Sequence, residues 1–443
     1  MTFETLITNG IIITVNADFD IIYNGAVGIA GGRIAYVGSA VDVPGGTASA
    51  RHIIDADGGL IMPGLVNTHT HLPMSLFRGL ADDIPLDQWL NSHIFPAEQK
   101  HLRPETVKWG ALLSCAEMLL SGTTTCCDGY FYEDAVAEAV SEAGMRAVLG
   151  QGVIDFPAPG VPDPGSNIVH AVDFVKMWKN RSPLILPSIF CHSPYTCSAK
   201  TLVSAKQAAK RENVLFQVHV AETRNEPDLA GLPPDTSPVK YLESLGVLDA
   251  DTLAVHAVWA DMDDISILAR NNVKISHNPE SNMKLASGIA PVAEMLDCGL
   301  VVGLGTDGCA SNNNLDMFSE MGTAARLHKV SRKDPTVMNA EKVIRMATIE
   351  GARAIGVGDR IGSVETGKEA DLVVVDIRQP HLLPLYHPAS HMVYAARGGD
   401  ARYVMVNGNL LVSNFRLTHL DGKDIMDRVN AVAKNIRVTD REE

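Results

Sequence analysis

The feature that most constrains the fold of this chain is an eightfold alternation of short apolar segments with helix-like segments, between residues 59 and 360. Each apolar segment has the length of a buried strand, and each is followed by a segment with apolar residues at helical spacing. The expected strands are Leu60–Asn67, Thr123–Asp128, Arg146–Gly152, Leu184–Cys191, Val214–Val220, Thr252–Val258, Val273–Ser276 and Leu300–Thr306. The expected helices are Glu105–Leu120, Glu133–Ala143, Ile168–Asn180, Ala199–Arg211, Pro238–Leu245, Asp261–Asn271, Ile289–Cys298 and Ala340–Ile355.

This alternation is typical of two α/β architectures, a closed (β/α)8 TIM-type barrel and an open doubly wound sheet. Polar residues follow six of the eight expected strands. A doubly wound sheet would gather them at one switch point and would usually carry a glycine-rich phosphate loop. No such loop stands between a strand and a helix in this sequence. We therefore predict a barrel.

The two ends of the chain have a different character, with short strands separated by turns. Residues 1–58 and 361–443 predict one small β-sandwich domain built from both ends, with a C-terminal helix, around a catalytic barrel at 59–360. An Asn-Gly pair at residues 9 and 10 predicts a hairpin. The segments that support the second domain are Leu6–Val15, Gly31–Gly38, Gly367–Asp376 and Ala401–Leu410.

Composition excludes some classes of partner. The 37 basic and 52 acidic residues give a formal charge of −15, which argues against nucleic acid or an anionic membrane as a partner. The seven cysteines are scattered, without a Cys-x-x-Cys pair, which is typical of a reducing compartment. No secretory signal and no apolar run long enough to span a bilayer is present, so we expect a cytoplasmic protein.

Four residues at expected strand ends form a candidate metal site. His69 and His71 follow the first strand and point to the same side of an extended chain. His219 lies in the fifth strand, and Asp307 follows the eighth. Each alone is more often a core histidine or a turn aspartate, but their joint placement predicts a site for one divalent metal. A metal held in this way lowers the pKa of water toward about 7.

Proton-transfer groups are expected beside that site. Asp307 and His256, which lies in the sixth strand, are placed to take a proton from water. Glu222 follows His219 by three residues and is placed to protonate a substrate heteroatom.

At this level of detail the chain resembles the amidohydrolase superfamily and, within it, the 5′-methylthioadenosine/S-adenosylhomocysteine deaminases, over essentially its full length. The superfamily features are Pro63–His71, His219–Thr223 and Gly305–Asp307. The more specific segments are Met74–Asp83, His192–Tyr195, Asp307–Met317 and Gly367–Leu372.

The resemblance implies a metal-dependent deaminase that converts the 6-amino group of a 5′-modified adenosine into the inosine analogue and ammonia. The cofactor would be one zinc ion, for which iron, manganese or nickel can substitute. The protein would be a homo-oligomer, either a dimer or a tetramer. The implied metal ligands are His69, His71, His219 and Asp307.

The resemblance also implies substrate contacts. Glu222 would hold and protonate the purine ring, and His256 would assist proton transfer. Glu98 would bind the ribose hydroxyls, for which a carboxylate is a suitable acceptor, and His192 would contact the nucleoside. Trp89 would either wall the adenine site or pack in the core.

One departure from the family bears on the substrate. Relatives use arginines in the third and fourth βα region for the 5′-substituent, but residues Ala147–Asn180 contain none here. We therefore expect a small apolar 5′-group.

Three alternatives remain open. The first is a deaminase or chlorohydrolase of guanine, pterin, cytosine or a triazine. The second is a two-metal cyclic amide hydrolase, but the fourth strand ends at Cys191-His192 without the bridging lysine, and Lys200 lies too far along the chain. The third is a non-catalytic purine- or metal-binding protein.

Overall fold

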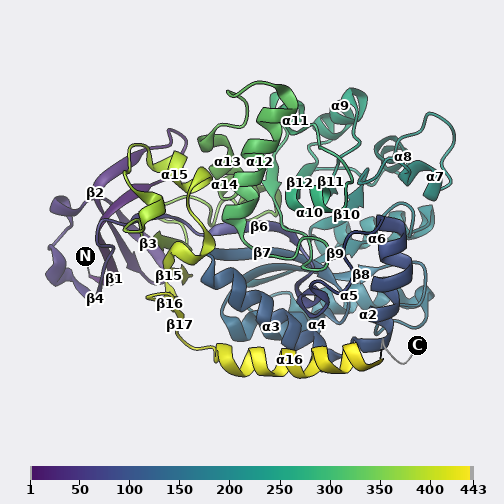
Figure 1. Cartoon of the computed structure of the whole chain (residues 1–443), viewed down its shortest axis with the longest axis horizontal. Helices are drawn as coiled ribbons and strands as arrows, with labels where there is room; N and C mark the ends of the chain where they lie inside the picture. The colour runs from purple at the N-terminus through teal and green to yellow at the C-terminus, as the bar shows by residue number, and fades with distance from the viewer. Residues whose placement is uncertain (1, 440–443) are drawn as a thin grey trace.

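A closed parallel barrel forms the larger part of the molecule. The computed structural model describes residues 2–439 and contains two sheets (Figure 1). The barrel sheet has eight parallel strands in sequence order, and the Asp307 N–H donates to the His69 carbonyl at 2.9 Å, which joins the last strand to the first. The predicted (β/α)8 barrel is confirmed. Its strands are β6 (Leu65–Thr70), β7 (Thr123–Tyr130), β8 (Arg146–Val153), β9 (Ile185–Cys191), β10 (Phe216–Val220), β11 (Thr252–His256), β12 (Lys274–His277) and β13 (Val302–Leu304).

Helices cover the outside of the barrel, and most lie where the sequence predicts them. The matching helices are α3 (Pro104–Leu120), α4 (Glu133–Ala143), α5 (Asn167–Trp178), α6 (Ala199–Glu212), α8 (Pro238–Ser244), α9 (Met262–Arg270) and α11 (Val292–Asp297). The short helices are α1 (Leu86–Gln88), α2 (Phe95–His101), α7 (Glu226–Leu229), α10 (Pro279–Lys284) and α15 (Pro388–Tyr394).

One long helix was missed. The helix α12 (Met317–Arg332) follows its N-cap residue Asp316, whose side chain accepts a hydrogen bond from the Phe318 N–H. Its buried face includes Glu320 and His328, so its apolar stripe is interrupted in the sequence.

The predicted strand Leu60–Asn67 is two strands in two different sheets. The strand β5 (Leu60–Pro63) pairs with the terminal sheet, whereas β6 begins at Leu65 in the barrel. Gly64 is the junction, and a Cβ there would lie 2.2 Å from the Thr124 side chain. A continuous apolar run does not reveal which partner each residue pairs with, so the sequence could not show this break.

The terminal sheet is built from both ends of the chain, as predicted, and lies beside the barrel (Figure 1). Its order is β17-β16-β15-β14-β5-β1-β2-β3, with β4 paired to β1. The C-terminal helix α16 (Gly422–Thr439) runs alongside α3. The strand bounds are β1 (Phe3–Ile13), β2 (Ile21–Ala30), β3 (Arg33–Ser39), β4 (Ala50–Asp55), β14 (Leu372–Val375), β15 (Ala401–Val406), β16 (Asn409–Ser413) and β17 (Arg416–Leu417).

Two further predictions were wrong in detail. The Asn9-Gly10 pair is not a hairpin but an irregularity within the continuous strand β1, where Asn9 has a φ of 55° and the pairing register with β2 shifts. The predicted helix Ala340–Ile355 is two helices, α13 (Ala340–Met346) and α14 (Ile349–Ala354). The break occurs where the Ala347 carbonyl accepts a hydrogen bond from the Val66 N–H of β6 at 2.8 Å.

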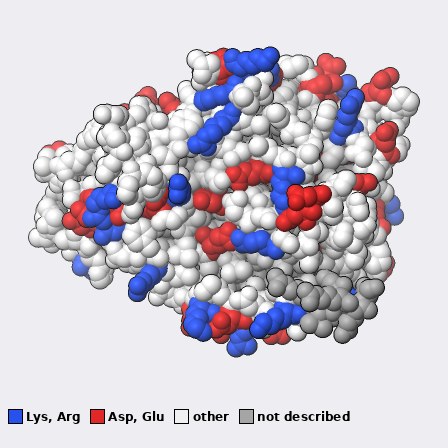
Figure 2. All heavy atoms as spheres, viewed as in Figure 1, with Lys and Arg blue, Asp and Glu red and all other residues white. Residues whose placement is uncertain are grey.

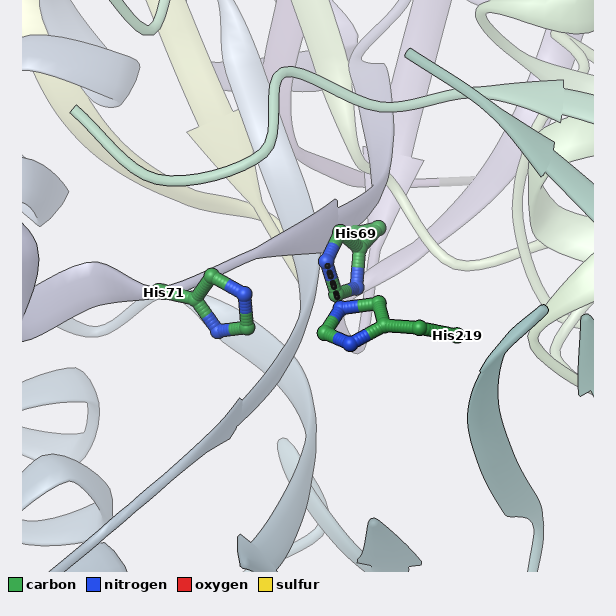
Figure 3. Close-up of side chains that lie close together, drawn as sticks. All are labelled: His69, His71 and His219. Atoms are coloured by element: carbon green, nitrogen blue, oxygen red, sulfur yellow. Dashed lines mark hydrogen bonds between the residues drawn. The ribbon is translucent and has the colours of Figure 1, made fainter. Parts of the chain in front are cut away.

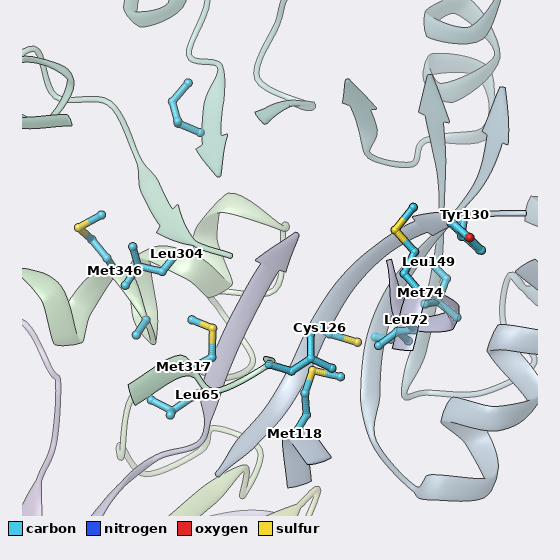
Figure 4. Close-up of a cluster of buried hydrophobic side chains, with 14 of the residues drawn as sticks. Leu65, Leu72, Met74, Met118, Cys126, Tyr130, Leu149, Leu304, Met317 and Met346 are labelled. Carbon is cyan, nitrogen blue, oxygen red and sulfur yellow. The ribbon is translucent and has the colours of Figure 1, made fainter. Parts of the chain in front are cut away.

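The core explains why the polar groups meet at one end. Buried apolar side chains such as Leu65, Met118, Cys126, Leu304 and Met317 fill the space around the barrel strands (Figure 4). The carboxyl ends of parallel strands open to the same face, so polar residues that follow them converge there.

The surface shows no segregation of charge on the face in Figure 2, where acidic and basic side chains are intermixed. Among residues 2–439, no helix combines the length and the hydrophobicity that a membrane crossing requires.

Candidate active site

Three histidines and one aspartate meet at the carboxyl end of the barrel. His69 and His71 come from the end of β6, and His219 comes from β10 (Figure 3). The Nε2 atoms of His69 and His219 are 3.1 Å apart. Asp307 Oδ1 lies 3.4 Å from His69 Nε2 and 3.3 Å from His71 Nε2. All four side chains are buried.

These separations suit a tetrahedral metal ion. Ligand bonds of 2.0–2.1 Å place neighbouring tetrahedral ligand atoms about 3.3–3.4 Å apart, close to the observed spacings. The ligand atoms of His69, His71 and His219 all lie within 4.8 Å of one another. Burial lowers the pKa of His71 to about 4 and holds that of His219 well below its usual range, so both rings are neutral and present lone pairs. The donor set therefore fits a divalent metal.

Neighbouring groups hold the ligands in orientation. The His71 Nδ1 is 2.6 Å from the Gly129 carbonyl and donates to it, which leaves Nε2 free to face Asp307. Asp307 Oδ2 accepts from the hydroxyls of Ser281 at 2.7 Å and Ser311 at 2.9 Å, while Oδ1 is directed at the histidines.

The backbone at this end of the barrel is strained at several non-glycine residues. Ala221, His256 and Asp307 have φ values of 51°, 75° and 63°, in the left-handed region that side chains with a Cβ rarely adopt. Such conformations cost about 1–3 kcal/mol each and gather at functional sites, where the surrounding structure enforces them. Here they lie at or just after strand ends and set the direction of Glu222, His256 and Asp307.

Glu222 lies beside the histidines, as the sequence predicts. Its Oε2 is 3.8 Å from His256 Nε2. The Glu226 carboxylate accepts from the N–H groups of Ala221 at 3.0 Å and of Glu222 at 2.8 Å, and so holds the loop that carries Glu222. Burial and the nearby Asp307 and Glu226 raise the pKa of Glu222 well above its usual range. A buried carboxyl in this state holds a proton that it can donate.

A cavity extends from these groups. Its walls include all the predicted substrate-contact residues, Glu98, Trp89, His192 and Glu222. Trp89 is buried and donates from Nε1 to the Ala81 carbonyl at 3.1 Å, so it both walls the cavity and packs in the core.

His192 lies beside the candidate metal ligands. Its Nδ1 is 2.9 Å from Thr196 Oγ1, and its ring centroid is 5.0 Å from that of His219.

Several residues of the cavity were given no role from the sequence. Tyr130 donates from its hydroxyl to Glu98 Oε1 at 2.6 Å, and Phe190 stacks edge-on against His219. Neither residue could be identified from the sequence, because an aromatic residue inside an apolar strand looks the same whether it lines a cavity or packs in the core. Asn278, Ser281 and Asn282 follow β12 behind the cavity wall, and their contacts with His256 and Asp307 could not be predicted from the sequence.

Removal of one candidate ligand tests the metal site. We expect His69→Ala to weaken divalent metal binding by more than the roughly 10–100-fold that loss of a supporting hydrogen bond costs. Metal stoichiometry is measured by mass spectrometry after dialysis, with His170→Ala, an exposed residue of α5, as the matched control. A wild-type metal content in His69→Ala would contradict the assignment.

Glu98 gives the protein a pH-dependent stability. Burial raises the pKa of Glu98 from 4.5 to about 8, and the Tyr130 hydrogen bond offsets part of this shift. The folded state therefore holds more protons than the unfolded state between these pH values, so stability falls as the pH rises from about 4.5 to about 8.

We expect Glu98→Gln, which cannot ionise, to remove this contribution. The unfolding free energy of the wild type minus that of the variant should decrease by on the order of a few kcal/mol between pH 5 and pH 8.5, measured by denaturant titration. A difference that does not vary with pH would refute the buried, protonated state.

Comparison with known proteins agrees with this geometry. The model of the amidohydrolase family matches residues 60–411. The chain is 46% identical, over 98% of both chains, to the 5-methylthioadenosine/S-adenosylhomocysteine deaminase of Syntrophobacter fumaroxidans. It is 42% identical, again over 98% of both, to the 5′-deoxyadenosine deaminase of Methanosarcina acetivorans.

A solved structure is similar along the whole chain. The crystal structure of an adenosine deaminase from Xanthomonas campestris with bound zinc superposes with a TM-score of 0.96 at 35% identity, over 99% of both chains. The family model matches most of the chain, and the relatives match nearly all of it. This protein belongs to the amidohydrolase family.

Proposed function

We propose that this protein is a hydrolytic deaminase that converts the 6-amino group of a 5′-modified adenosine into the inosine analogue and ammonia. The observation that carries the proposal is the position of Glu222, a buried carboxyl with a raised pKa, beside the cluster of His69, His71, His219 and Asp307 at the wall of one cavity. The names of the relatives at 42–46% identity support the same reaction.

The reaction assigns a task to each group. One zinc ion, the metal we propose for the four ligands, would lower the pKa of water and supply a nucleophile at neutral pH. Asp307 accepts the water proton, and Glu222 donates its proton to N1 of the purine as oxygen adds to C6. Asp307 then passes the water proton to the amino group, the C6–N bond breaks and ammonia leaves, and the proton of the C6 hydroxyl returns to Glu222 as the carbonyl of the product forms.

We propose that Glu98 binds the ribose. It lies on α2 at the cavity wall, and its Oε1 accepts from Tyr130. A carboxyl group offers two oxygens to two neighbouring hydroxyls, which suits the 2′- and 3′-positions. We propose that His192 and Trp89 contact the nucleoside from the other walls.

A second pocket, which shares Phe95, Tyr195 and Leu285 with the cavity and is called its mouth below, bears on the 5′-substituent. Phe156, from the loop without arginine, packs on Phe95 with ring centroids 5.3 Å apart, and both line the mouth with Trp259. These aromatic rings support a small apolar 5′-group. Arg224 also lines the mouth, with its guanidinium carbon 5.8 Å from the centre of the Trp259 ring, and it offers a positive charge to a homocysteine carboxylate.

A substrate panel tests both the reaction and this preference. Zinc-loaded protein is incubated with adenosine, 5′-deoxyadenosine, 5′-methylthioadenosine, S-adenosylhomocysteine, guanine and a chlorotriazine, and the products are followed by absorbance. We expect the highest kcat/KM for 5′-deoxyadenosine or 5′-methylthioadenosine.

The other outcomes are informative. Equal or higher efficiency with S-adenosylhomocysteine would overturn the apolar preference. Turnover of the guanine or triazine alone would assign a different heterocycle. No turnover of any nucleoside would end the deaminase proposal.

Substitution of Glu222 separates proton donation from metal binding. We expect Glu222→Gln to reduce kcat by about 10²–10⁴-fold, because the amide has no acidic proton, while zinc content stays at the wild-type value. Glu138→Gln, at an exposed position of α4, is the matched control. Loss of zinc from Glu222→Gln would instead make Glu222 a ligand.

Some expectations stay predictions. They are the domain bounds at 1–58, 59–360 and 361–443, a cytoplasmic location, a dimer or tetramer, and the absence of nucleic acid and membrane partners. The division of the chain into two sheets supports the domain scheme, although β5 extends the terminal sheet past residue 58.

A further inference from the structure

Two side-chain amides converge on one nitrogen of His256. The Nδ2 atom of Asn282 is 3.0 Å from His256 Nδ1, and the Nδ2 atom of Asn278 is 3.3 Å from the same nitrogen. All three side chains are buried. The amides come from the segment that follows β12, whereas His256 ends β11.

A chain of hydroxyl groups orients the Asn278 amide. Ser276 donates from Oγ to Asn278 Oδ1 at 3.0 Å, and Ser276 Oγ lies 2.7 Å from Thr68 Oγ1 on β6. Because the carbonyl oxygen of Asn278 is occupied by a donor, its NH2 group is the end that faces His256. Two barrel strands, β6 and β12, and the segment that follows β12 thus contribute to the environment of a single ring nitrogen on β11.

The other ring nitrogen faces the cavity. His256 Nε2 is 3.8 Å from Glu222 Oε2, and His256 lines the cavity. A neutral imidazole carries one proton, and a ring nitrogen that accepts an amide hydrogen bond cannot also carry it.

We propose that Asn282 and Asn278 are positioning residues that hold neutral His256 in the tautomer protonated at Nε2. The imidazole then directs an N–H group, and not a lone pair, into the cavity.

This inference rests on the proposed function and deepens it. A neutral His256 with its proton on Nε2 cannot accept the water proton at that atom, so it donates a hydrogen bond to the oxygen that adds to C6. The base is then Asp307 rather than His256, which separates two residues that the sequence had placed in the same role. Glu222 keeps the transfer to N1.

Nuclear magnetic resonance observes the tautomer directly. Zinc-loaded protein labelled with 15N-histidine is recorded in two-bond 1H–15N correlation spectra, and His256→Gln assigns the signal by its loss. We expect His256 to show an unprotonated Nδ1 and a protonated Nε2. A protonated Nδ1 would overturn the proposal. This readout needs no turnover, so it stands or falls independently of the deaminase proposal.

Variants of Asn282 connect the tautomer to catalysis. Asn282→Asp replaces the donor with an acceptor of the same shape and should move the proton to Nδ1. We expect kcat to fall by about 10²-fold or more, with KM within about threefold and zinc content unchanged. Asn282→Leu, which removes the donor without supplying an acceptor, should cause a smaller loss of kcat.

The control is Asn271→Asp, where the amide donates to the Ile267 carbonyl at the end of α9, away from the cavity. It should leave kcat and the His256 signals unchanged. A kcat within threefold of wild type in Asn282→Asp, or a loss of kcat without a change of tautomer, would refute the role of Asn282.

Discussion

The hydrogen bond from the Asp307 N–H to the His69 carbonyl is the contact on which the candidate site depends. It joins the last strand of the barrel to the first at their carboxyl ends, 238 positions apart in the chain. Without closure, the imidazole of His69 and the carboxylate of Asp307 would lie at opposite edges of an open sheet. Closure places their side-chain atoms 3.4 Å apart, at the distance that a shared metal ion requires.

Closure also determines the chemistry of the groups that it gathers. Burial raises the pKa of Glu222 and lowers that of His219, so the acid holds its proton and the ring keeps its lone pair. In water at neutral pH a glutamate is almost fully ionised, whereas a histidine is already mostly neutral, so burial changes the protonation of Glu222 far more than that of His219. The left-handed backbone of His256 and Asp307 is one cost of this arrangement, and the packed barrel around it offsets that strain.

Much of the fold was predictable because it depends on local pattern. The alternation of apolar strands and helical stripes identified the barrel, and the helix α4 was predicted to the residue. Two of the errors share one physical origin. At Gly64 and at Ala347 the chain changes partner without changing its apolar character, so pairing, not composition, decides where the element ends. Asn9 carries a turn signal, but the neighbouring strands keep β1 continuous.

The sequence by itself determined the residue types and their order at the strand ends, and this was enough to propose His69, His71, His219 and Asp307 as one cluster. Only the tertiary structure decided which partners orient the side chains of the site around that cluster. Tyr130 beside Glu98, and Asn278 and Asn282 beside His256, are long-range contacts between separate elements. The physical reason is that the local sequence pattern indicates only which face of a helix or strand is buried. A hydrogen bond across the barrel depends instead on the relative positions of strands that are distant in the sequence.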